Sequence, residues 1–306
     1  MGFTIFYFSS CGFFKSCSLF SSYKSRNLRE TNRIEFVISD ERNDFVANKM
    51  KDKLLAGKPA LGLSMMIPSI QLVEMAGQLG FDWVLLDCEH GALNLETVEA
   101  MIIAAEANGI TPIVRPYKNE PELIGQYLDR GAKGIQAPHV NTAEEAQAIV
   151  NAVKFPPQGN RSIAVGTRAA GYGFHRSMAE YVKQANQDLL VCVQIEEKQA
   201  VTNIEQIAAV PGVDVLFVGP SDLSQSLGHP GEASHPEIKP VIDEAFSRIL
   251  ASGKIAGTAG NLPTTTKRLE QGVLYYYTHL TTLLAYASAE YLKNIESSLK
   301  SNEVRK

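Results

Sequence analysis

The stretch that decides the fold reads Leu189-Leu-Val-Cys-Val-Gln-Ile-Glu196, then a segment with the pattern of a helix, then Val215-Leu-Phe-Val-Gly-Pro-Ser-Asp222. Each apolar run has the length and the β-branched content of a buried strand, and each is followed by a carboxylate. The interval between Glu196 and Asp222 suits one strand–helix–strand repeat. If the two strands are parallel neighbours, both carboxylates point into one space, where oxygen ligands suit a hard divalent cation.

The same unit recurs from Ala60 onward: a short apolar strand, a polar turn, an amphipathic helix and a glycine just before the next strand. Glycine readily adopts the left-handed conformation that ends many helices, so these glycines mark helix-to-strand junctions. They are Gly80, Gly109, Gly131, Gly212, Gly253 and Gly272. The predicted strands are 60–66, 83–87, 111–115, 133–137, 189–195, 213–218, 254–259 and 273–277. Eight such units predict a closed (β/α)8 barrel, the TIM barrel, over residues 50–306, with a final helix near 281–300.

One segment, residues 155–176, is a long Gly- and Arg-bearing loop before a helix predicted near 177–187. Loops of this length are commonly functional. Two interpretations stay open: a solvated surface excursion, or a lid or arm that reaches a neighbouring subunit.

Composition excludes some classes of function. The chain has 306 residues, of which 45% are apolar and 20% charged, and a formal net charge of −4, which provides no basic surface for nucleic acid. The four cysteines form no C-x-x-C pair and are interpreted as free thiols of a reducing compartment. They are Cys11, Cys17, Cys88 and Cys192.

Residues 1–49 differ from the rest of the chain. No acidic residue precedes Glu30, whereas Phe, Ser, Lys and Arg are dense, which is compatible with a mitochondrial or plastid presequence. The alternative is a poorly ordered leader or an extended gene model, because Met50-Lys-Asp-Lys resembles a natural start; the expected location is then the cytoplasm. No uncharged stretch there reaches about 18 residues, so we expect no membrane span.

Polar residues follow five consecutive predicted strands. Active sites of such barrels lie at the carboxyl ends of the strands. The residues there are Asp87, Glu89 and His90; Arg115; Gln136 and His139; Gln194 and Glu196; Ser221 and Asp222. Their convergence on one rim favours a functional site over packing.

Glu196 and Asp222 are the candidate metal ligands. Two carboxylates with no cysteine or paired histidine beside them favour an octahedral oxygen site for Mg²⁺ or Mn²⁺, completed by water and substrate. The alternative is that both acids merely stabilise the first turns of helices.

His90 and Arg115 are candidates for proton transfer and anion binding. An imidazole titrates near neutrality and can act as a general base, although a histidine in a turn is often structural. A guanidinium at the rim can hold a carboxylate with two hydrogen bonds. The alternative for Arg115 is an internal salt bridge to Glu89 or Asp87.

Asp129 ends a predicted helix, where the helix dipole disfavours negative charge. We therefore expect a cationic partner. His90 is one candidate, and an exposed pair with Arg130 or Lys133 is the alternative.

Lysine placement bears on the chemistry. A Schiff-base mechanism needs a lysine inside the barrel. Lys133 and Lys254 stand at the starts of strands, on the opposite rim, whereas Lys118 and Lys198 lie past strand ends as solvated residues. A metal-assisted mechanism fits better.

Six motifs stand in order along the chain: Gly62-Leu-Ser-Met-Met66, Asp87-Cys-Glu89-His90, Val114-Arg115-Pro116, Leu128-Asp129-Arg-Gly131, Val193-Gln194-Ile-Glu196 and Gly219-Pro-Ser221-Asp222-Leu223. Together they resemble the metal-dependent (class II) pyruvate aldolases of the HpcH/HpaI type, which cleave 4-hydroxy-2-oxo acids and include 4-hydroxy-2-oxoheptanedioate and 2-keto-3-deoxy-L-rhamnonate aldolases. The resemblance covers about residues 50 to 295.

The resemblance implies a role for each matching residue. His90 would be the catalytic histidine, Asp129 would raise its basicity, and Arg115 would stabilise the transition state. Glu196 and Asp222 would bind the metal ion, which would be Mg²⁺ or Mn²⁺ and in some members Co²⁺. Gln194 and the Ser221 backbone would bind pyruvate. The resemblance also implies a phosphoenolpyruvate/pyruvate-type barrel and a hexamer in which the final helix packs on another subunit.

The chain departs from this family at strand eight, where Tyr277-Thr-His279-Leu replaces a segment that commonly carries an acid. Two alternatives therefore stay open. One is an oxaloacetate decarboxylase or acyl-CoA lyase on the same barrel, although only the arginines of 161–176 offer a basic track for CoA. The other is a non-catalytic binding or regulatory barrel.

Overall fold

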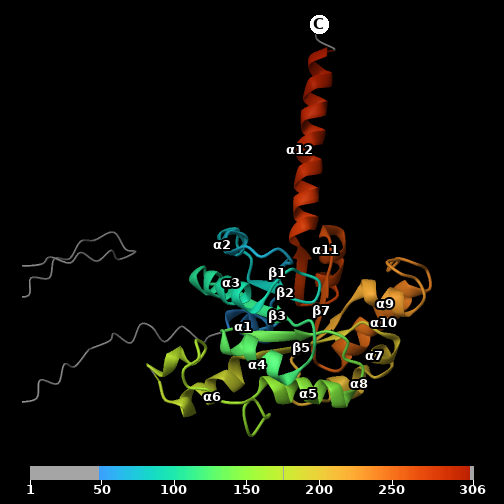
Figure 1. The fold of residues 1–306 in the computed structure, drawn as a ribbon. Helices are drawn as coiled ribbons and strands as arrows, with labels where there is room; N and C mark the ends of the chain where they lie inside the picture. Colours follow the sequence, from blue (N-terminus) through green and yellow to red (C-terminus); the bar gives the residue numbers. More distant parts are fainter. Residues whose placement is uncertain (1–47, 175, 304–306) are drawn as a thin grey trace, which may run out of the picture. The chain divides into compact units, whose positions relative to one another are not determined.

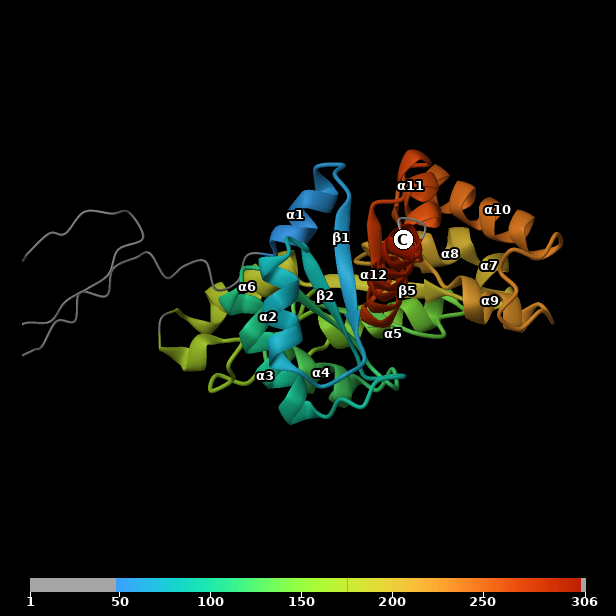
Figure 2. The same ribbon diagram turned by 90° about the horizontal axis from the view of Figure 1, so that it is seen from above.

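The structure, a computed structural model, describes residues 48–174 and 176–303, without the side chains of 300–303. Eight parallel strands form a closed barrel in the order β1 to β8. Figures 1 and 2 show the helices arranged around these strands. The strands are β1 (Ala60–Met65), β2 (Trp83–Asp87), β3 (Thr111–Arg115), β4 (Gly134–Ala137), β5 (Leu190–Ile195), β6 (Val215–Val218), β7 (Ile255–Ala259) and β8 (Tyr275–His279). The predicted (β/α)8 barrel is confirmed.

The helices alternate with the strands around the barrel. They are α1 (Lys49–Leu55), α2 (Ile70–Gln78), α3 (Leu95–Ala107), α4 (Pro121–Asp129), α5 (Ala143–Val153), α6 (Met178–Asp188), α7 (Lys198–Thr202), α8 (Ile204–Ala208), α9 (Pro220–Ser226), α10 (Ile238–Ala251), α11 (Leu262–Glu270) and α12 (Leu280–Glu303). Apart from Asn48 and Lys49, the predicted leader lies outside the described residues. None of the described helices is both long enough and apolar enough to span a membrane.

The six junction glycines behave as predicted. Each has a positive φ, from 70° at Gly109 to 108° at Gly131. In this conformation a residue with a Cβ is strained, so glycine lets the chain leave each helix and enter the next strand at once.

Strand β8 starts two residues later than the predicted 273–277. Gly272 lies two residues past the end of α11, and the amide of Val273 still donates to the carbonyl of Arg268 in the last turn of that helix. The sheet register begins only where Tyr275 pairs with Ala60. As a result His279, rather than Tyr277, ends the strand at the carboxyl-end rim.

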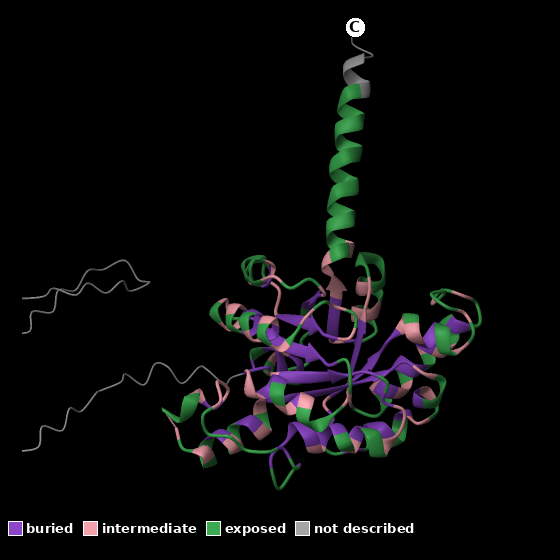
Figure 3. Cartoon of the chain, in the orientation of Figure 1, coloured by how far each residue is buried: buried purple, intermediate pink, exposed green. Residues whose placement is uncertain are grey.

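Two apolar clusters hold the barrel together. The larger lies between the strands and the surrounding helices, and the smaller fills the barrel interior. Figure 3 shows that the strands are mostly buried. Interior rings pack closely: the centroids of Trp83 and Tyr275 are 4.2 Å apart, and Phe217 stacks on Tyr277 at 5.3 Å. Met50 and Leu54 of α1 join this interior cluster. Helix α1 therefore covers the amino ends of the strands, and the carboxyl ends form the other rim.

The 155–176 loop packs back onto the barrel. The side chain of Arg161 is buried and stacks on the Phe155 ring, and Arg168 forms an ion pair with Glu106 at the end of α3. The loop is therefore more than a solvated excursion. Whether it also reaches a neighbouring subunit stays a prediction.

Candidate active site

Glu196 lies at the centre of the rim where the predicted site residues were expected. It directly follows β5, and its side chain is almost fully buried. One carboxylate oxygen accepts a hydrogen bond from the His139 amide (2.7 Å), and the other accepts one from the Gln194 side chain (2.5 Å). Burial raises the pKa of Glu196; the hydrogen bond and the charge of His139 lower it in part, and the nearby charges of Asp222 and Glu89 raise it. A buried carboxylate close to two other acids is a strong site for a cation.

Gly219 leaves room for this carboxylate. A Cβ at position 219 would lie 2.9 Å from Oε2 of Glu196 and 3.0 Å from its Cβ. Pro220, the next residue, starts α9, and Asp222 lies in the first turn of that helix. The Gly-Pro turn therefore brings Asp222 near Glu196 without crowding it.

The Gln194 side chain, the last but one of β5, is hydrogen-bonded at both ends of its amide. Its amide oxygen accepts a hydrogen bond from Gln136 (2.6 Å), while its amide nitrogen donates to Glu196. Gln136 in turn accepts one from the hydroxyl of Tyr275 (3.0 Å). These buried side chains form a continuous chain of hydrogen bonds that fixes the orientation of the Glu196 carboxylate.

Arg115 is the last residue of β3 and is paired inside the chain. Its Nε and Nη2 donate to the two oxygens of Asp87 at 2.9 and 2.5 Å, and Nε lies 3.2 Å from Glu89. Burial by itself lowers the pKa of the guanidinium, but the hydrogen bond with Asp87 and the neighbouring anionic groups raise it overall. The salt bridges to Asp87 and Glu89, considered from the sequence as an alternative, are therefore present, and they keep a fixed cation at the rim.

His90 lies in the turn after β2, with a largely exposed side chain. Its amide donates to Asp87 (3.2 Å), and its ring Nε2 is 3.9 Å from Glu89. A Cβ at Gly91 would lie 2.1 Å from the Asp87 carbonyl oxygen, so only glycine fits this turn. The turn thus presents the His90 imidazole to solvent at the mouth of the barrel.

Asp129 lies elsewhere. It is the last residue of α4, and β4 begins a few residues later, so it stands at the amino ends of the strands, on the face opposite to His90. Its carboxylate accepts a hydrogen bond from Arg161 (2.7 Å). The expected cationic partner exists, but among the described residues it is Arg161 rather than His90, Arg130 or Lys133.

His139 belongs to the rim, although the sequence assigned it no role. It has a positive φ of 53°, which turns its ring toward three carboxylates. Nδ1 lies 3.0 Å from Glu197 and 3.4 Å from Glu196, and Nε2 lies 3.1 Å from Glu89. Burial lowers the pKa of the ring, yet these acids raise it overall. Its place directly after Pro138 at a strand end was the signal that could have identified it.

The donor set fits a hard divalent cation. Glu196 and Asp222 supply carboxylate oxygens, and the buried negative charge of Glu196 favours a bound cation, whose remaining positions water and substrate would fill. Glu196 and Asp222 are the residues that would hold such an ion.

Known proteins share this barrel fold. Residues 64–279 match the family described as HpcH/HpaI aldolase/citrate lyase. The chain belongs to this family. It is 40% identical over 210 residues to a pyruvate aldolase of Rhizobium etli, covering 69% of this chain and 82% of the relative. It is 38% identical over 234 residues to a 5-keto-4-deoxy-D-glucarate aldolase of Escherichia coli, covering 76% and 90%.

A solved structure of an HpcH/HpaI aldolase/citrate lyase family protein from Burkholderia cenocepacia aligns with a TM-score of 0.77 and 30% identity, covering 82% of this chain and all of that one. The predicted family is confirmed, and with it the class of enzyme, a carbon–carbon lyase.

Proposed function

We propose that this HpcH/HpaI family member catalyses the reversible aldol cleavage of a 4-hydroxy-2-oxo acid to pyruvate and an aldehyde, with Mg²⁺ or Mn²⁺ as cofactor and Co²⁺ as a substitute. The observation that carries the proposal is the buried Glu196 carboxylate beside Asp222, with the paired Arg115 cation on the same rim. The relatives named pyruvate aldolase and 5-keto-4-deoxy-D-glucarate aldolase support it.

Each rim residue has a task in this reaction. When bound to Glu196 and Asp222, the divalent cation would supply a Lewis acid for the 2-oxo acid. His90 accepts the proton of the 4-hydroxyl group as the bond between C3 and C4 breaks and the aldehyde carbonyl forms. The electron pair of that bond passes into the enolate of pyruvate, whose negative charge Arg115 stabilises. The proton held by His90 then returns, through water, to C3 of the enolate, which yields pyruvate and restores the neutral imidazole.

Substrate contacts of Gln194 and Ser221 stay predictions. Ser221 is exposed in the first turn of α9, where its backbone amide can reach a ligand. Because both ends of the Gln194 amide are engaged, we infer that Gln194 contributes mainly by holding Glu196 in place.

A catalytic role for Asp129 requires a second copy of the chain. Within one chain it lies on the face opposite to His90, so it can act only on the site of a neighbouring subunit. Helix α12 supports assembly, because it exposes a stripe of large apolar side chains that includes Leu284, Tyr291, Ile295 and Leu299. We therefore propose a homo-oligomer, a hexamer by resemblance, in which neighbouring subunits cover this stripe.

Mixed oligomers test the shared site. Oligomers of His90→Ala and Asp129→Ala chains should recover activity that neither variant has alone, since some sites then combine intact residues from two chains. Failure to recover activity, in oligomers shown by mass spectrometry to be mixed, would contradict the role of Asp129.

A substrate panel tests the reaction itself. A coupled assay should detect pyruvate release from 4-hydroxy-2-oxo acids after addition of Mg²⁺, Mn²⁺ or Co²⁺. Faster turnover of oxaloacetate or of an acyl-CoA thioester would favour a decarboxylase or CoA lyase instead. Calorimetric binding of pyruvate without cleavage of any member of the panel would favour a binding protein.

A further inference from the structure

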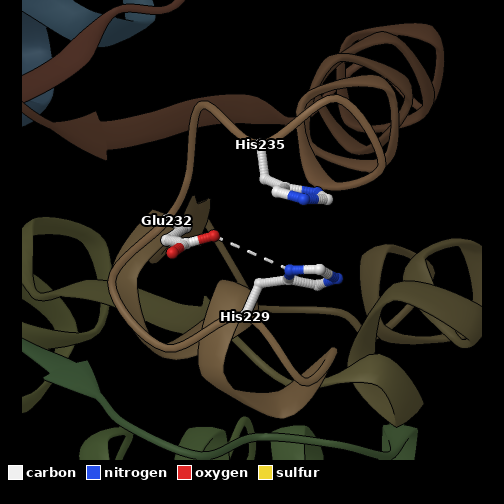
Figure 4. Close-up of side chains that lie close together, drawn as sticks. All are labelled: His229, Glu232 and His235. Carbon is white, nitrogen blue, oxygen red and sulfur yellow. Dashed lines mark ion pairs between the residues drawn. The ribbon is translucent and has the colours of Figure 1, made fainter.

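A second group of metal-ligating side chains lies outside the barrel mouth. His229, Glu232 and His235 stand in the connection between α9 and α10, and one donor atom from each lies within 4.8 Å of the others (Figure 4). It is the only group of three or more such residues found in the described part of the chain. His229 follows the end of α9, whereas Asp222 lies in the first turn of that helix.

The backbone explains why these side chains converge. The three residues follow one another at intervals of three, and each interval closes a turn: the Glu232 amide donates to the His229 carbonyl (3.1 Å), and the His235 amide donates to the Glu232 carbonyl (2.8 Å). Two successive turns of this kind bring the side chains to one side of the connection. The imidazole rings of His229 and His235 stack with their centroids 3.8 Å apart.

Each ring nitrogen of His229 lies near a carboxylate, an arrangement that is common for metal-binding histidines. Nε2 lies 3.3 Å from the Glu237 carboxylate, while Nδ1 faces the Glu232 carboxylate across 3.8 Å. Metal-binding histidines commonly direct their other ring nitrogen to a carboxylate, which orients the ring and makes it more basic. When Nε2 carries the proton and donates it to Glu237, Nδ1 has a free lone pair on the side of Glu232, which is where a metal ion would bind.

His235 requires a small adjustment. Its Nδ1 accepts a hydrogen bond from the Glu237 amide, but at 3.3 Å this contact is long. The ring can therefore turn and exchange a weak hydrogen bond for a metal bond. Glu232 is largely exposed, so its side chain is free to follow.

We propose that His229, Glu232 and His235 form a binding site for Zn²⁺, separate from the oxygen site at the barrel mouth. Two imidazoles and one carboxylate are ligands that Zn²⁺ accepts in tetrahedral sites, with water in the fourth position, whereas Mg²⁺ favours oxygen ligands. The bound ion would tie together the turns that connect α9 to α10. The proposal does not depend on the reaction at the mouth.

Zinc binding to the full-length protein tests the proposal. Metal-free protein is saturated with Mg²⁺ to occupy the mouth and then titrated with Zn²⁺ by equilibrium dialysis and calorimetry. The wild type should bind one equivalent of Zn²⁺. Since loss of an outer partner of a metal ligand already weakens binding 10- to 100-fold, the double variant H229Q/H235Q should bind at least about 100-fold more weakly.

Matched variants show whether zinc binds at these three residues or elsewhere in the protein. Ser234→Ala, in the same connection, should bind Zn²⁺ as the wild type does, and X-ray absorption should report two imidazoles at about 2.0–2.1 Å. Circular dichroism checks that every variant is folded. Unchanged zinc binding in H229Q/H235Q would overturn the proposal, and so would zinc binding that disappears in E196Q/D222N. If the wild type binds no Zn²⁺, the proposal also fails, and His229 then only forms ion pairs with Glu232 and Glu237.

Discussion

Gln194→Leu probes how the barrel holds its central carboxylate. Leucine preserves most of the buried volume but removes the hydrogen bond to Glu196 and leaves the Gln136 amide without its acceptor. A hydrogen bond to a charged group contributes about 1.5–3 kcal/mol, and a buried unsatisfied amide costs about 1–3 kcal/mol. We therefore expect the free energy of unfolding to fall by about 3–5 kcal/mol.

Metal affinity is the more specific measurement. Without Gln194 the Glu196 carboxylate loses one of its two orienting hydrogen bonds, so the affinity for Mn²⁺ should fall about 10- to 100-fold in a calorimetric titration. The stability loss is measured separately by urea unfolding. If the m-value equals that of the wild type, the variant has changed the free energy of unfolding and not the compactness of either state.

Gln136→Leu is the matched control. It removes the neighbouring link of the same chain of hydrogen bonds, including the acceptor of Tyr275, but leaves the bond between Gln194 and Glu196 intact. It should lose comparable stability while keeping near wild-type Mn²⁺ affinity. If the two variants bind Mn²⁺ equally well, Gln194 does not position Glu196.

Three further predictions follow from local packing and charge. Gly219→Ala should fold but bind Mn²⁺ roughly 10- to 100-fold more weakly, because its Cβ would lie 2.9 Å from the Glu196 carboxylate; wild-type affinity would contradict this. Gly62→Ala should destabilise the barrel by at least about 3 kcal/mol in urea unfolding, since its Cβ would lie 2.3 Å from the Trp83 ring. The control Gly125→Ala, whose Cβ would meet no atom within 4 Å in α4, should leave the free energy of unfolding unchanged or raise it. Equal effects of the two substitutions would refute the packing argument. Burial lowers the pKa of Lys154 from its ordinary 10.5 to about 8. Between these two values the unfolded chain binds more protons than the folded chain, so the free energy of unfolding should rise with pH, by about 2 kcal/mol from about pH 7.5 to 9.5. Lys154→Met should lack this rise, and a flat wild-type profile would argue against the lowered pKa.

Much of the fold was predictable because it depends on local rules. Short continuous apolar runs identify strands that are buried on both faces, and a glycine such as Gly131 marks the end of a helix whatever packs around it. Strand β8 was displaced in the prediction because Val273 and Leu274 are apolar like a strand, while the amide of Val273 still belongs to the end of α11. Hydrophobicity does not distinguish a helix terminus from the first residues of a strand.

The site was predictable only in part. The positions that follow strand ends, such as Arg115 and Glu196, can be identified without coordinates, since parallel strands bring their carboxyl ends to one rim. The partners of those side chains depend on rotamers and turn conformations. The positive φ of His139 and the hydrogen bonds of Gln194 have no signature in the residue order. The position of Asp129, in contrast, could have been predicted from the sequence. A helix that precedes a strand ends at the amino ends of the strands, so an acid at the end of such a helix lies on the face opposite to the rim.

Metal-dependent release of pyruvate tests the central claim most directly. After thorough chelation, turnover of a 4-hydroxy-2-oxo acid should fall roughly 1,000-fold, as expected when several kcal/mol of Lewis-acid stabilisation are lost, and Mg²⁺ or Mn²⁺ should restore it. Glu196→Ala should remain inactive after metal is added, whereas Glu205→Gln, an exposed acid paired with Arg248, should recover fully. Unchanged turnover by the chelated wild type, or recovery of Glu196→Ala on adding metal, would contradict the account.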